Sequence, residues 1–350
     1  MKLIFSLSVL LLTLVQSFGC DICPMDEYST VNNRGYVGVF HRYSLFRGYN
    51  YIPEQSNPFS FNQATRPKKH SVFQDDNYYE DSQNDYESFQ TIELRFNYNY
   101  KDHWNFLVVL PFHHNINYFD KVTPPIGQTF DSTTVTSGIG DLILGVQRLN
   151  TYETATWRHQ LKYGFGLSLP TGNSELRANG EEPYNDPAHL PGKGATDLIL
   201  RVNYTGSTND QFGFKVNALY ANSLKKAQSG NFTGIPSNQL EITSYRFGNR
   251  MTFDALMFYV FGKSRFKVIP KIGYSFNHAK KDQANAIYIE NTGGIIGYGN
   301  FGLDLVFGRF TLQTIFSKPV HQNLDGQQLN STGRFQAGLL FSLKTKDKEK

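Results

Sequence analysis

The clearest pattern of hydrophobic and polar positions lies between Trp157 and Leu169, in the sequence WRHQLKYGFGLSL. Apolar or aromatic residues occupy every second position from His159 to Leu169, and polar, cationic or glycine residues occupy the positions between them. Successive side chains of a β-strand point to opposite faces, so this pattern predicts a strand with one apolar wall and one polar wall. At about 3.3 Å per residue the strand extends roughly 43 Å, which matches a membrane and its interfaces when the strand is tilted by about 40°.

Similar segments recur along the rest of the chain, although the first and tenth alternate poorly. Together they predict an all-β protein formed by a single antiparallel transmembrane barrel of about 12 strands. Besides the strand already described, the predicted strands cover residues 35–46, 88–100, 105–118, 137–149, 196–204, 212–220, 245–261, 266–276, 297–307, 310–316 and 334–343. Pro111 and Pro270 fall inside two of them, where a proline removes a ladder hydrogen bond unless a bulge or the barrel rim accommodates it.

The connections alternate between long and short, which sets the expected orientation. In outer-membrane barrels of Gram-negative bacteria, short turns face the periplasm and long loops face the outside. An even number of strands then leaves both ends of the barrel in the periplasm. The first long loop, 49–87, is acidic and Tyr-rich in its second half, and we expect it to be an outer partner site or a lumen plug.

The first residues predict export. Lys2, an apolar run over 3–15 and Ser17-Phe18-Gly19 form a charged start, a short apolar core and a small-x-small cleavage site. We therefore divide the chain into a signal peptide (1–19), a periplasmic N-terminal segment (20–34), the barrel (35–343) and a basic periplasmic tail (344–350). An uncleaved anchor is the alternative for the first segment.

Cys20 and Cys23 are the only cysteines, in the sequence CDICPM at the expected mature N-terminus. Three interpretations are open. The two thiols can form a local disulfide in an oxidising compartment, Cys20 can carry a lipid, or both can bind a soft metal together with Met25. No histidine lies nearby to complete a ligand set, so the metal interpretation is weak.

Composition agrees with a barrel rather than with helical membrane spans. The chain has 29 Phe, 21 Tyr and 30 Gly but only 39% hydrophobic residues, and its mean hydropathy is −0.42. After the leader, no run of about eighteen apolar residues is present that could span as a helix. The net charge of +4 is modest and scattered, so we expect outer-membrane lipid and small solutes as partners, and no nucleic acid. The oligomeric state is left open.

If the apolar face meets lipid, the charged positions of the other face line the lumen. Cations outnumber acids there two to one, which biases permeation toward anions if a path is open. Alternatively, opposite charges pair across neighbouring strands and fill the interior. The lumen-lining candidates are Glu93, Arg95, Asp141, Arg158, Lys162, Asp197, Arg201, Lys215, Arg246, Arg250, Asp254, Lys267, Lys271, Asp304 and Arg334.

The tetrapeptide Asp-Leu-Ile-Leu occurs twice, starting at Asp141 and at Asp197, each time just after a long loop. The two carboxylates can form part of a ring below the outer mouth, or each can cap its turn. We favour the caps, because Gly-Asp is ordinary turn chemistry.

Enzymatic motifs are missing. The sequence has no G-x-S-x-G elbow, HExxH, phosphate-binding loop or dinucleotide fingerprint. His113 and His114 adjoin each other, but neighbours on a strand face oppositely and cannot share a ligand set. We therefore predict no enzyme, no catalytic residue and no cofactor.

The segments SGIGDLILGVQRL, YGFGLSLPTGN and GNFGLDLVFG resemble bacterial outer-membrane transporters or porins of the phenol-degradation type. The N-terminal CDIC followed by VGVFHRYSLFRGYN is similar to a Bacteroidetes branch of that group, although this chain has Pro24-Met25 where branch members extend the cysteine cluster. The resemblance implies an outer-membrane barrel and a channel for small organic solutes.

The resulting hypothesis is an outer-membrane channel or transporter that passes small, organic or anionic solutes by passive diffusion. The alternative is a non-conducting barrel that acts as a receptor or anchor through its extracellular loops. An outer-membrane enzyme ranks third.

Overall fold

The computed structural model describes residues 35–49, 70–71, 78–79, 81–101, 103–123, 130–174, 177–178, 182–183, 187–208, 211–224, 245–262 and 265–343. The predicted signal peptide (1–19), the segment 20–34 with Cys20, Cys23 and Met25, and the tail 344–350 lie outside these residues. Most of the loop 49–87 does too, so its predicted role stays a prediction.

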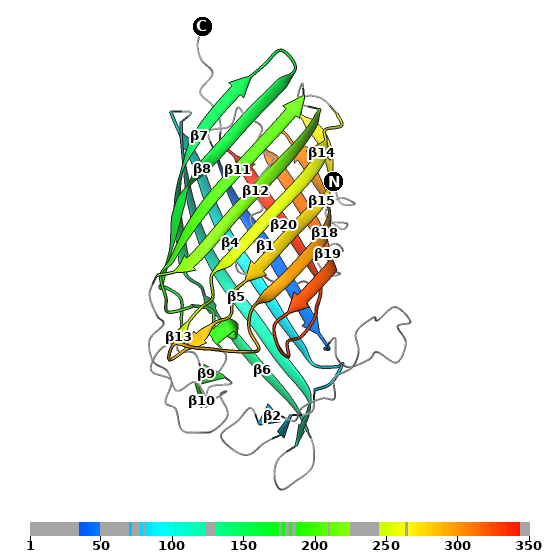
Figure 1. Cartoon of the computed structure of the whole chain (residues 1–350). Helices are drawn as coiled ribbons and strands as arrows, with labels where there is room; N and C mark the ends of the chain where they lie inside the picture. The colour runs from blue at the N-terminus through cyan, green and yellow to red at the C-terminus, as the bar shows by residue number, and fades with distance from the viewer. Residues whose placement is uncertain are drawn as a thin grey trace, which may run out of the picture.

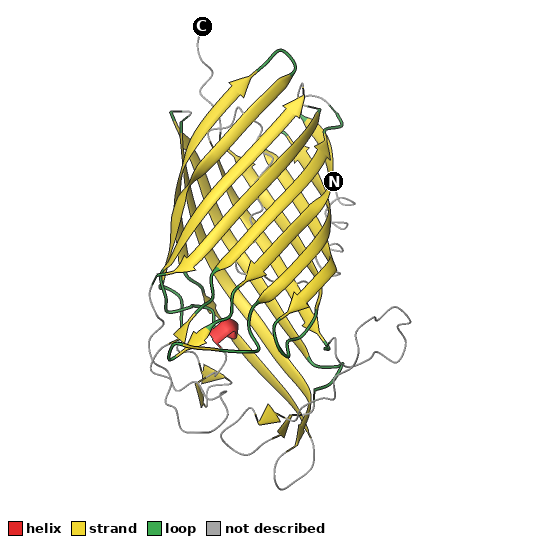
Figure 2. Cartoon of the chain, viewed as in Figure 1, coloured by secondary structure: helices red, strands yellow, loops and turns green. Residues whose placement is uncertain are grey.

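The described chain folds into a closed antiparallel barrel of 12 strands, as the alternation predicts (Figures 1 and 2). β6 and β7 are two halves of one of these strands, because both pair with β5. The wall consists of β1 (Gly35–Arg47), β4 (Tyr86–Tyr100), β5 (Trp104–Thr123), β6 (Phe130–Ile139), β7 (Leu142–Glu153), β8 (Trp157–Leu169), β11 (Asp197–Thr208), β12 (Phe212–Ser223), β14 (Arg250–Tyr259), β15 (Phe266–Ala279), β18 (Gly294–Phe307), β19 (Phe310–Leu324) and β20 (Ser331–Ser342).

Two strand pairings complete the ring. β1 pairs with β20, and β5 pairs with β7, so each strand of the wall has a neighbour on both sides. The backbone N–H of Leu343 donates to the carbonyl of Gly35 at 2.8 Å, which brings the two ends of the barrel together at the turn end. Short turns lie at that end and the long loops at the other, as predicted (Figure 1).

Seven two-residue strands and one 3₁₀ turn of the described chain lie at the loop end. They are β2 (His70–Ser71), β3 (Tyr78–Tyr79), β9 (Arg177–Ala178), β10 (Glu182–Pro183), β13 (Tyr245–Arg246), β16 (Gln283–Ala284), β17 (Ile287–Tyr288) and a single 3₁₀ turn, η1 (Pro187–His189). Among the described residues, no helix has the length and apolar character needed to cross a membrane.

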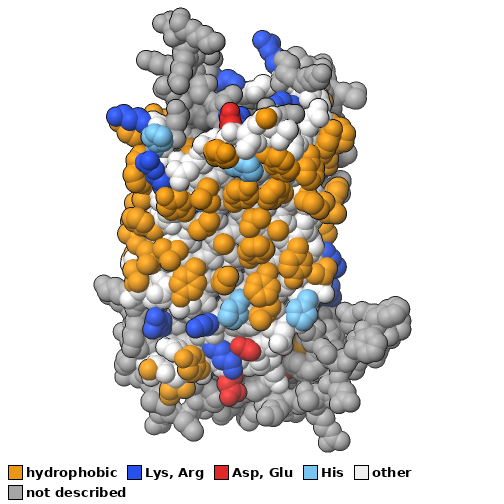
Figure 3. Space-filling view, turned by 45° about the horizontal axis from the view of Figure 1, so that its top comes forward, with side chains coloured by type: hydrophobic (Ala, Val, Ile, Leu, Met, Phe, Trp, Pro, Cys, Tyr) orange, Lys and Arg blue, Asp and Glu red, His pale blue; other side chains and the backbone are white. Residues whose placement is uncertain are grey.

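The two faces of the wall separate as the sequence predicts. On β8, Phe165 is 54% exposed on the outer face, whereas Gln160 is only 8% exposed on the inner face. Hydrophobic side chains form a band across the outer face of the barrel that Figure 3 shows. Trp104 and Trp157 are the first residues of β5 and β8, so both lie at the turn end, where aromatic side chains suit a membrane interface.

A β-bulge accommodates Pro111. Phe112 pairs with Ile139 and Val109 with Ile143, so three residues, 140–142, oppose two on β5. The carbonyl of Pro111 accepts the N–H of Gly140 at 2.9 Å, and the missing proline N–H falls where the ladder is already interrupted. Pro270 lies near the turn end. The last pair of the ladder between β14 and β15 at that end is Phe258 with Lys271, so the ladder does not include Pro270.

One predicted strand begins later than expected. Of the predicted strand 245–261, only β14, from Arg250, belongs to the wall; Tyr245 and Arg246 form β13, which pairs with β16 outside the barrel. Asp282 holds this segment away from the wall, because its carboxylate accepts the Tyr245 hydroxyl and, at 2.6 Å, the N–H of Gly248. Arg246 is therefore exposed in a loop and does not lie on the inner face.

We expect a charged side chain on the outer face to lower the stability of the barrel. Phe165→Lys should lower the free energy of unfolding by about 2–4 kcal/mol, the cost of a lysine on the lipid face near the middle of the bilayer. Urea titration of the protein refolded into lipid vesicles measures this change. Phe165→Leu, which stays apolar, is the matched control. Equal stability of the lysine variant and the control would contradict the assignment of the faces.

Candidate functional site

The inner face of the barrel carries the predicted charged residues other than Arg246. Seven of them are almost completely buried: Glu93, Arg95, Asp141, Asp197, Lys215, Asp304 and Arg334. The others are partly exposed inside the barrel: Arg158, Lys162, Arg201, Arg250, Asp254, Lys267 and Lys271. Whether they line a conducting path stays a prediction.

A buried ion triad joins β1 and β4. Glu93 accepts from Arg42 through one carboxylate oxygen and from Arg95 through the other, with the Arg95 Nε at 2.7 Å. The Arg95 guanidinium also lies 4.2 Å from the centre of the Phe40 ring. Charge-assisted bonds of this kind satisfy buried charges that would otherwise be costly, so the triad fixes this part of the interior.

Further charged groups have partners on β15, β18 and β20. The Nζ of Lys271 lies 2.5 Å from a carboxylate oxygen of Asp304, whose side chain is completely buried. Arg334 stacks over the Tyr298 ring at 4.0 Å. Part of the interior is therefore filled by charged side chains that contact one another or an aromatic ring.

A row of polar side chains crosses four neighbouring strands of the inner wall. Lys162 on β8 pairs in register with Asn203 on β11, which pairs with Asn217 on β12, which pairs with Asp254 on β14. Asn203 is 3% exposed, and neither its amide oxygen nor its amide nitrogen bonds to any described protein group. The Asn217 side-chain oxygen also has no such partner. Buried polar atoms of this kind are normally satisfied by water or a ligand, so the row indicates a wet interior.

At the loop end, the residues that follow β8 fold into the mouth of the barrel. We call residues 187–193 the mouth segment. The carbonyl of His189 accepts the Asn115 side-chain amide at 2.8 Å and the Thr136 hydroxyl at 2.5 Å, both from the inner wall. Its imidazole ring stacks on Phe89 at 4.9 Å. The mouth segment is thus fixed against β4, β5 and β6 on the inside.

Asp141, in the bulge between β6 and β7, holds the two ends of this loop. One carboxylate oxygen accepts the N–H of Gly172 at 3.0 Å and the other accepts the N–H of Lys193 at 2.9 Å. Asp197 acts from β11, where it accepts the Lys193 ammonium at 3.1 Å and the Ser223 hydroxyl at 2.6 Å. The two aspartates of the repeated tetrapeptide therefore bind the loop rather than form an open ring, and Asp141 caps N–H groups outside its own turn.

Three glycines pack backbone against backbone at the same place. A Cβ on Gly192 would lie 2.4 Å from the carbonyl carbon of Gly172, and a Cβ on Gly172 would lie 2.7 Å from that of Gly140. Any side chain at these positions would push the loop away from the bulge. Glycine is therefore required here for close approach, not for its φ angle.

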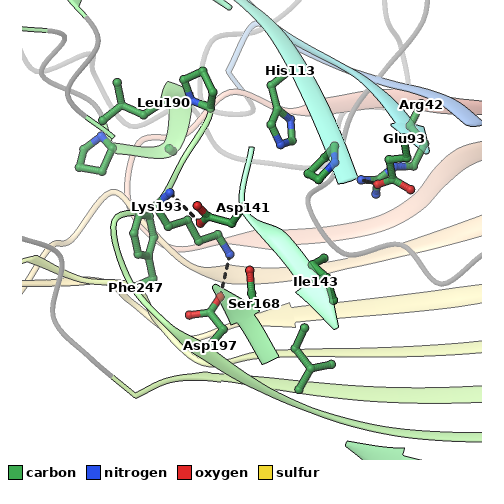
Figure 4. A pocket seen from close by; sticks show the side chains of 15 residues that line it. Arg42, Glu93, His113, Asp141, Ile143, Ser168, Leu190, Lys193, Asp197 and Phe247 are labelled. Atoms are coloured by element: carbon green, nitrogen blue, oxygen red, sulfur yellow. Dashed lines mark hydrogen bonds and ion pairs between the residues drawn. The ribbon is translucent and has the colours of Figure 1, made fainter. Parts of the chain in front are cut away.

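The mouth segment, the bulge and the ion triad enclose a pocket (Figure 4). Its polar side chains include Lys193, Asp141 and Asp197 on one side, and His113, Glu93 and Arg42 on the other (Figure 4). Apolar lining comes from the mouth segment, Phe247 and the strands. A solute that entered from the loop end would meet this pocket before the polar row.

Sequence reasoning missed Arg42, Lys193 and His189. Arg42 lies on β1, whose inner face also carries Tyr36 and Phe40, and these aromatic residues hide the alternation. Counting every second residue from Tyr36 places Arg42 on the inner face. Lys193 and His189 lie in a loop, where no periodicity marks a position as inward.

The histidines behave as their positions predict. His113 is buried on the inner face with its Nδ1 3.1 Å from the Thr91 hydroxyl, whereas His114 lies on the other face, 2.6 Å from the Ser137 hydroxyl. Within the described ranges, no group of His, Cys, Asp and Glu has a metal-binding arrangement.

Outside the membrane-spanning strands, the turn before β4 is tied to β5. Burial raises the pKa of the Asp85 carboxyl above its usual range, although the N–H groups of Asp120 and Ser82 donate to it and act in the opposite direction.

The chain is similar to known proteins in its fold and not in its sequence. No protein-family model matches the chain, and no curated protein matches its sequence. The COG4313 outer-membrane channel from Pseudomonas putida F1 is similar with a TM-score of 0.58 and 12% identity, over 92% of this chain and 100% of that chain. The NanC porin gives a TM-score of 0.39 with 10% identity, over 87% and 100% of the two chains. The CymD monoaromatic hydrocarbon channel gives 0.39 with 9% identity, over 89% of each.

At these identities the likeness is one of fold. Together with the closed wall and its apolar band, it defines the protein as a bacterial outer-membrane β-barrel.

We expect the loop to loosen without Asp141. Asp141→Ala leaves two N–H groups without their acceptor, and loss of hydrogen bonds to a charged group costs about 1.5–3 kcal/mol each. Hydrogen exchange at the amides of residues 187–193 should become faster. Gly192→Ala should have the same effect by a steric route. Glu153→Ala, which removes a rim ion pair with Arg158, is the control, and unchanged exchange in both loop variants would contradict the anchoring role.

Proposed function

We propose that the protein is a passive outer-membrane channel for small solutes, with the mouth segment as its constriction. The observation that carries the proposal is the row from Lys162 to Asp254. The Asn203 amide and the Asn217 side-chain oxygen are buried without a partner among the described residues, and a solvated path supplies the hydrogen bonds they lack.

The size of the barrel is compatible with such a path. Eight-stranded barrels are filled by side chains and sixteen-stranded porins hold open water channels, so a barrel of 12 strands falls between these limits. The ion triad and the Lys271–Asp304 pair narrow the interior. The proposal is therefore a narrow channel that takes small solutes only.

The charge of the interior favours anions weakly in this proposal. Arg42 joins the inner cations as Arg246 leaves them, so cations still exceed acids among the described inward positions. Lys162 and Lys267 form no ion pair with a described group, in contrast to Lys271, and we propose that they act as the selectivity-setting cations.

The resemblance to porins of the phenol-degradation type, and to a Bacteroidetes branch, stays a prediction. The cysteine motif that suggests the branch lies outside the described residues. Organic solutes are compatible with the pocket, since the mouth segment and Phe247 give it an apolar side.

One observation favours the alternative of a receptor or anchor. The hairpin of β16 and β17 at the loop end carries Ile287 and Tyr288, each 63% exposed. Apolar side chains presented to the outside suit contact with a partner protein. A barrel closed by its internal pairs would then serve as a support for this hairpin.

Conductance of the purified protein in a planar bilayer tests the channel. We expect discrete current steps, and a reversal potential of anion-favouring sign under a salt gradient. Lys162→Gln together with Lys267→Gln should move the reversal potential toward zero. Asp141→Ala should enlarge the steps, because it frees the mouth segment.

The control is Lys101→Gln, which alters an exposed cation in a turn outside the lumen. Bilayers that remain closed at all voltages, for the natural protein and for Asp141→Ala, would reject the channel and favour the receptor or anchor.

A further inference from the structure

Lys318 points out of the barrel into the apolar band. Its neighbour Ser317 is buried on the inner face beside Arg334, so Lys318 is on the outer face of β19. The outward residues on either side of it are Phe316, 46% exposed, and Val320, 64% exposed. A charged residue among lipid-facing side chains is costly and calls for a specific explanation.

The ammonium of Lys318 is directed toward the loop end. Its Nζ donates to the carbonyl of Thr332 at 3.1 Å, and Thr332 is the second residue of β20, which starts at that end. Leu45 pairs with Gly333 and Phe46 with Ser331, so Thr332 is the extra residue of a bulge. The lysine thus extends its charge toward the outer membrane interface, where lipid headgroups begin.

The wall beside Lys318 lacks side chains at two outward positions. Gly299 on β18 pairs with Lys318 on one side and with Tyr274 of β15 on the other, and Gly297 pairs with His321. A Cβ on Gly299 would meet only Val320, at 3.5 Å, whereas Tyr274 already leans over Gly297. An apolar floor at Gly299 therefore adjoins Lys318 and the exposed His321 of β19, while the Lys318 ammonium extends to the β20 side.

Cationic side chains at this level form a border. On the face that Figure 3 shows, Lys, Arg and His side chains lie at the loop-side edge of the hydrophobic band, with acidic side chains beyond them, and others lie at the opposite edge. Within the described part of the chain, no acidic side chain forms an ion pair with Lys318. The combination of a cation without an ion-pair partner, an imidazole on the same strand and an apolar floor matches a lipid with a phosphorylated headgroup.

We propose that the outer wall over β15, β18 and β19 binds a phosphate-bearing lipid of the outer leaflet. Lys318 and His321 contact the phosphate, and one acyl chain lies over Gly299, beside the Tyr274 ring that covers Gly297. This site is on the outside of the barrel and is independent of the channel.

The experiment measures lipid retained by the purified full-length protein. The probe is bisphosphorylated lipid A, compared with the same lipid after removal of its phosphates, and bound lipid is counted by native mass spectrometry. We expect the phosphorylated form to be retained preferentially. Lys318→Gln should weaken that retention about fivefold, the usual effect of one lysine near an anionic headgroup. Inorganic phosphate in large excess should not displace the lipid.

Two further variants keep the test decisive. Gly299→Val adds a side chain that the wall accommodates and should weaken retention without removing charge. Lys101→Gln, at the opposite rim, should leave retention unchanged. Heat-modifiable migration on gels confirms that each variant is folded. Equal retention by the natural protein, Lys318→Gln and Gly299→Val would overturn the site, as would displacement by inorganic phosphate alone.

Discussion

The absence of water in the hydrocarbon core is the constraint on which this structure depends. Each backbone N–H and C=O at that depth must find a partner within the protein, so a sheet that spans a membrane must have no free edge. Here the pairing of β1 with β20 and of β5 with β7 removes both edges. Closure in turn fixes the side chains, because alternate positions of each strand must face lipid and lumen.

The interruptions of the ladder are placed where the protein uses them. The bulge opposite Pro111 turns Asp141 inward, and Asp141 then anchors the loop that enters the mouth. The bulge at Thr332 frees a carbonyl that receives Lys318. In both cases a local irregularity of the wall creates a binding position that a regular strand does not offer.

The fold could be predicted from the sequence because alternation is a local signal. β8 begins at Trp157 and ends at Leu169, the bounds that alternation predicts, and the short turns fall where expected. The candidate site was only partly predictable. Charged residues on well-alternating strands, such as Lys162 and Lys271, face inward. Whether such a residue has an ion-pair partner, as Lys271 has in Asp304, depends on another strand and leaves no local sequence signal.

Other failures have specific physical causes. Arg246 was assigned to the wall because the pattern near it continues β14, whereas the distant Asp282 holds that segment in a loop sheet. The anchoring of the mouth segment depends on contacts between Gly140, Gly172 and Gly192, which are separated along the chain by two strands and a loop. Such contacts exist only in the closed barrel, so no reading along the chain could have located them.

Accessibility of single cysteines along β8 tests the central claim most directly. In a background with Cys20 and Cys23 replaced by serine, cysteines are placed one at a time from position 160 to position 167 in protein reconstituted in vesicles. A closed barrel with a wet lumen predicts that a water-soluble thiol reagent labels the even positions, and that a lipid-soluble reagent labels the odd ones. Labelling that does not alternate along β8 would contradict the account. So would labelling of the odd positions by the water-soluble reagent and of the even positions by the lipid-soluble one.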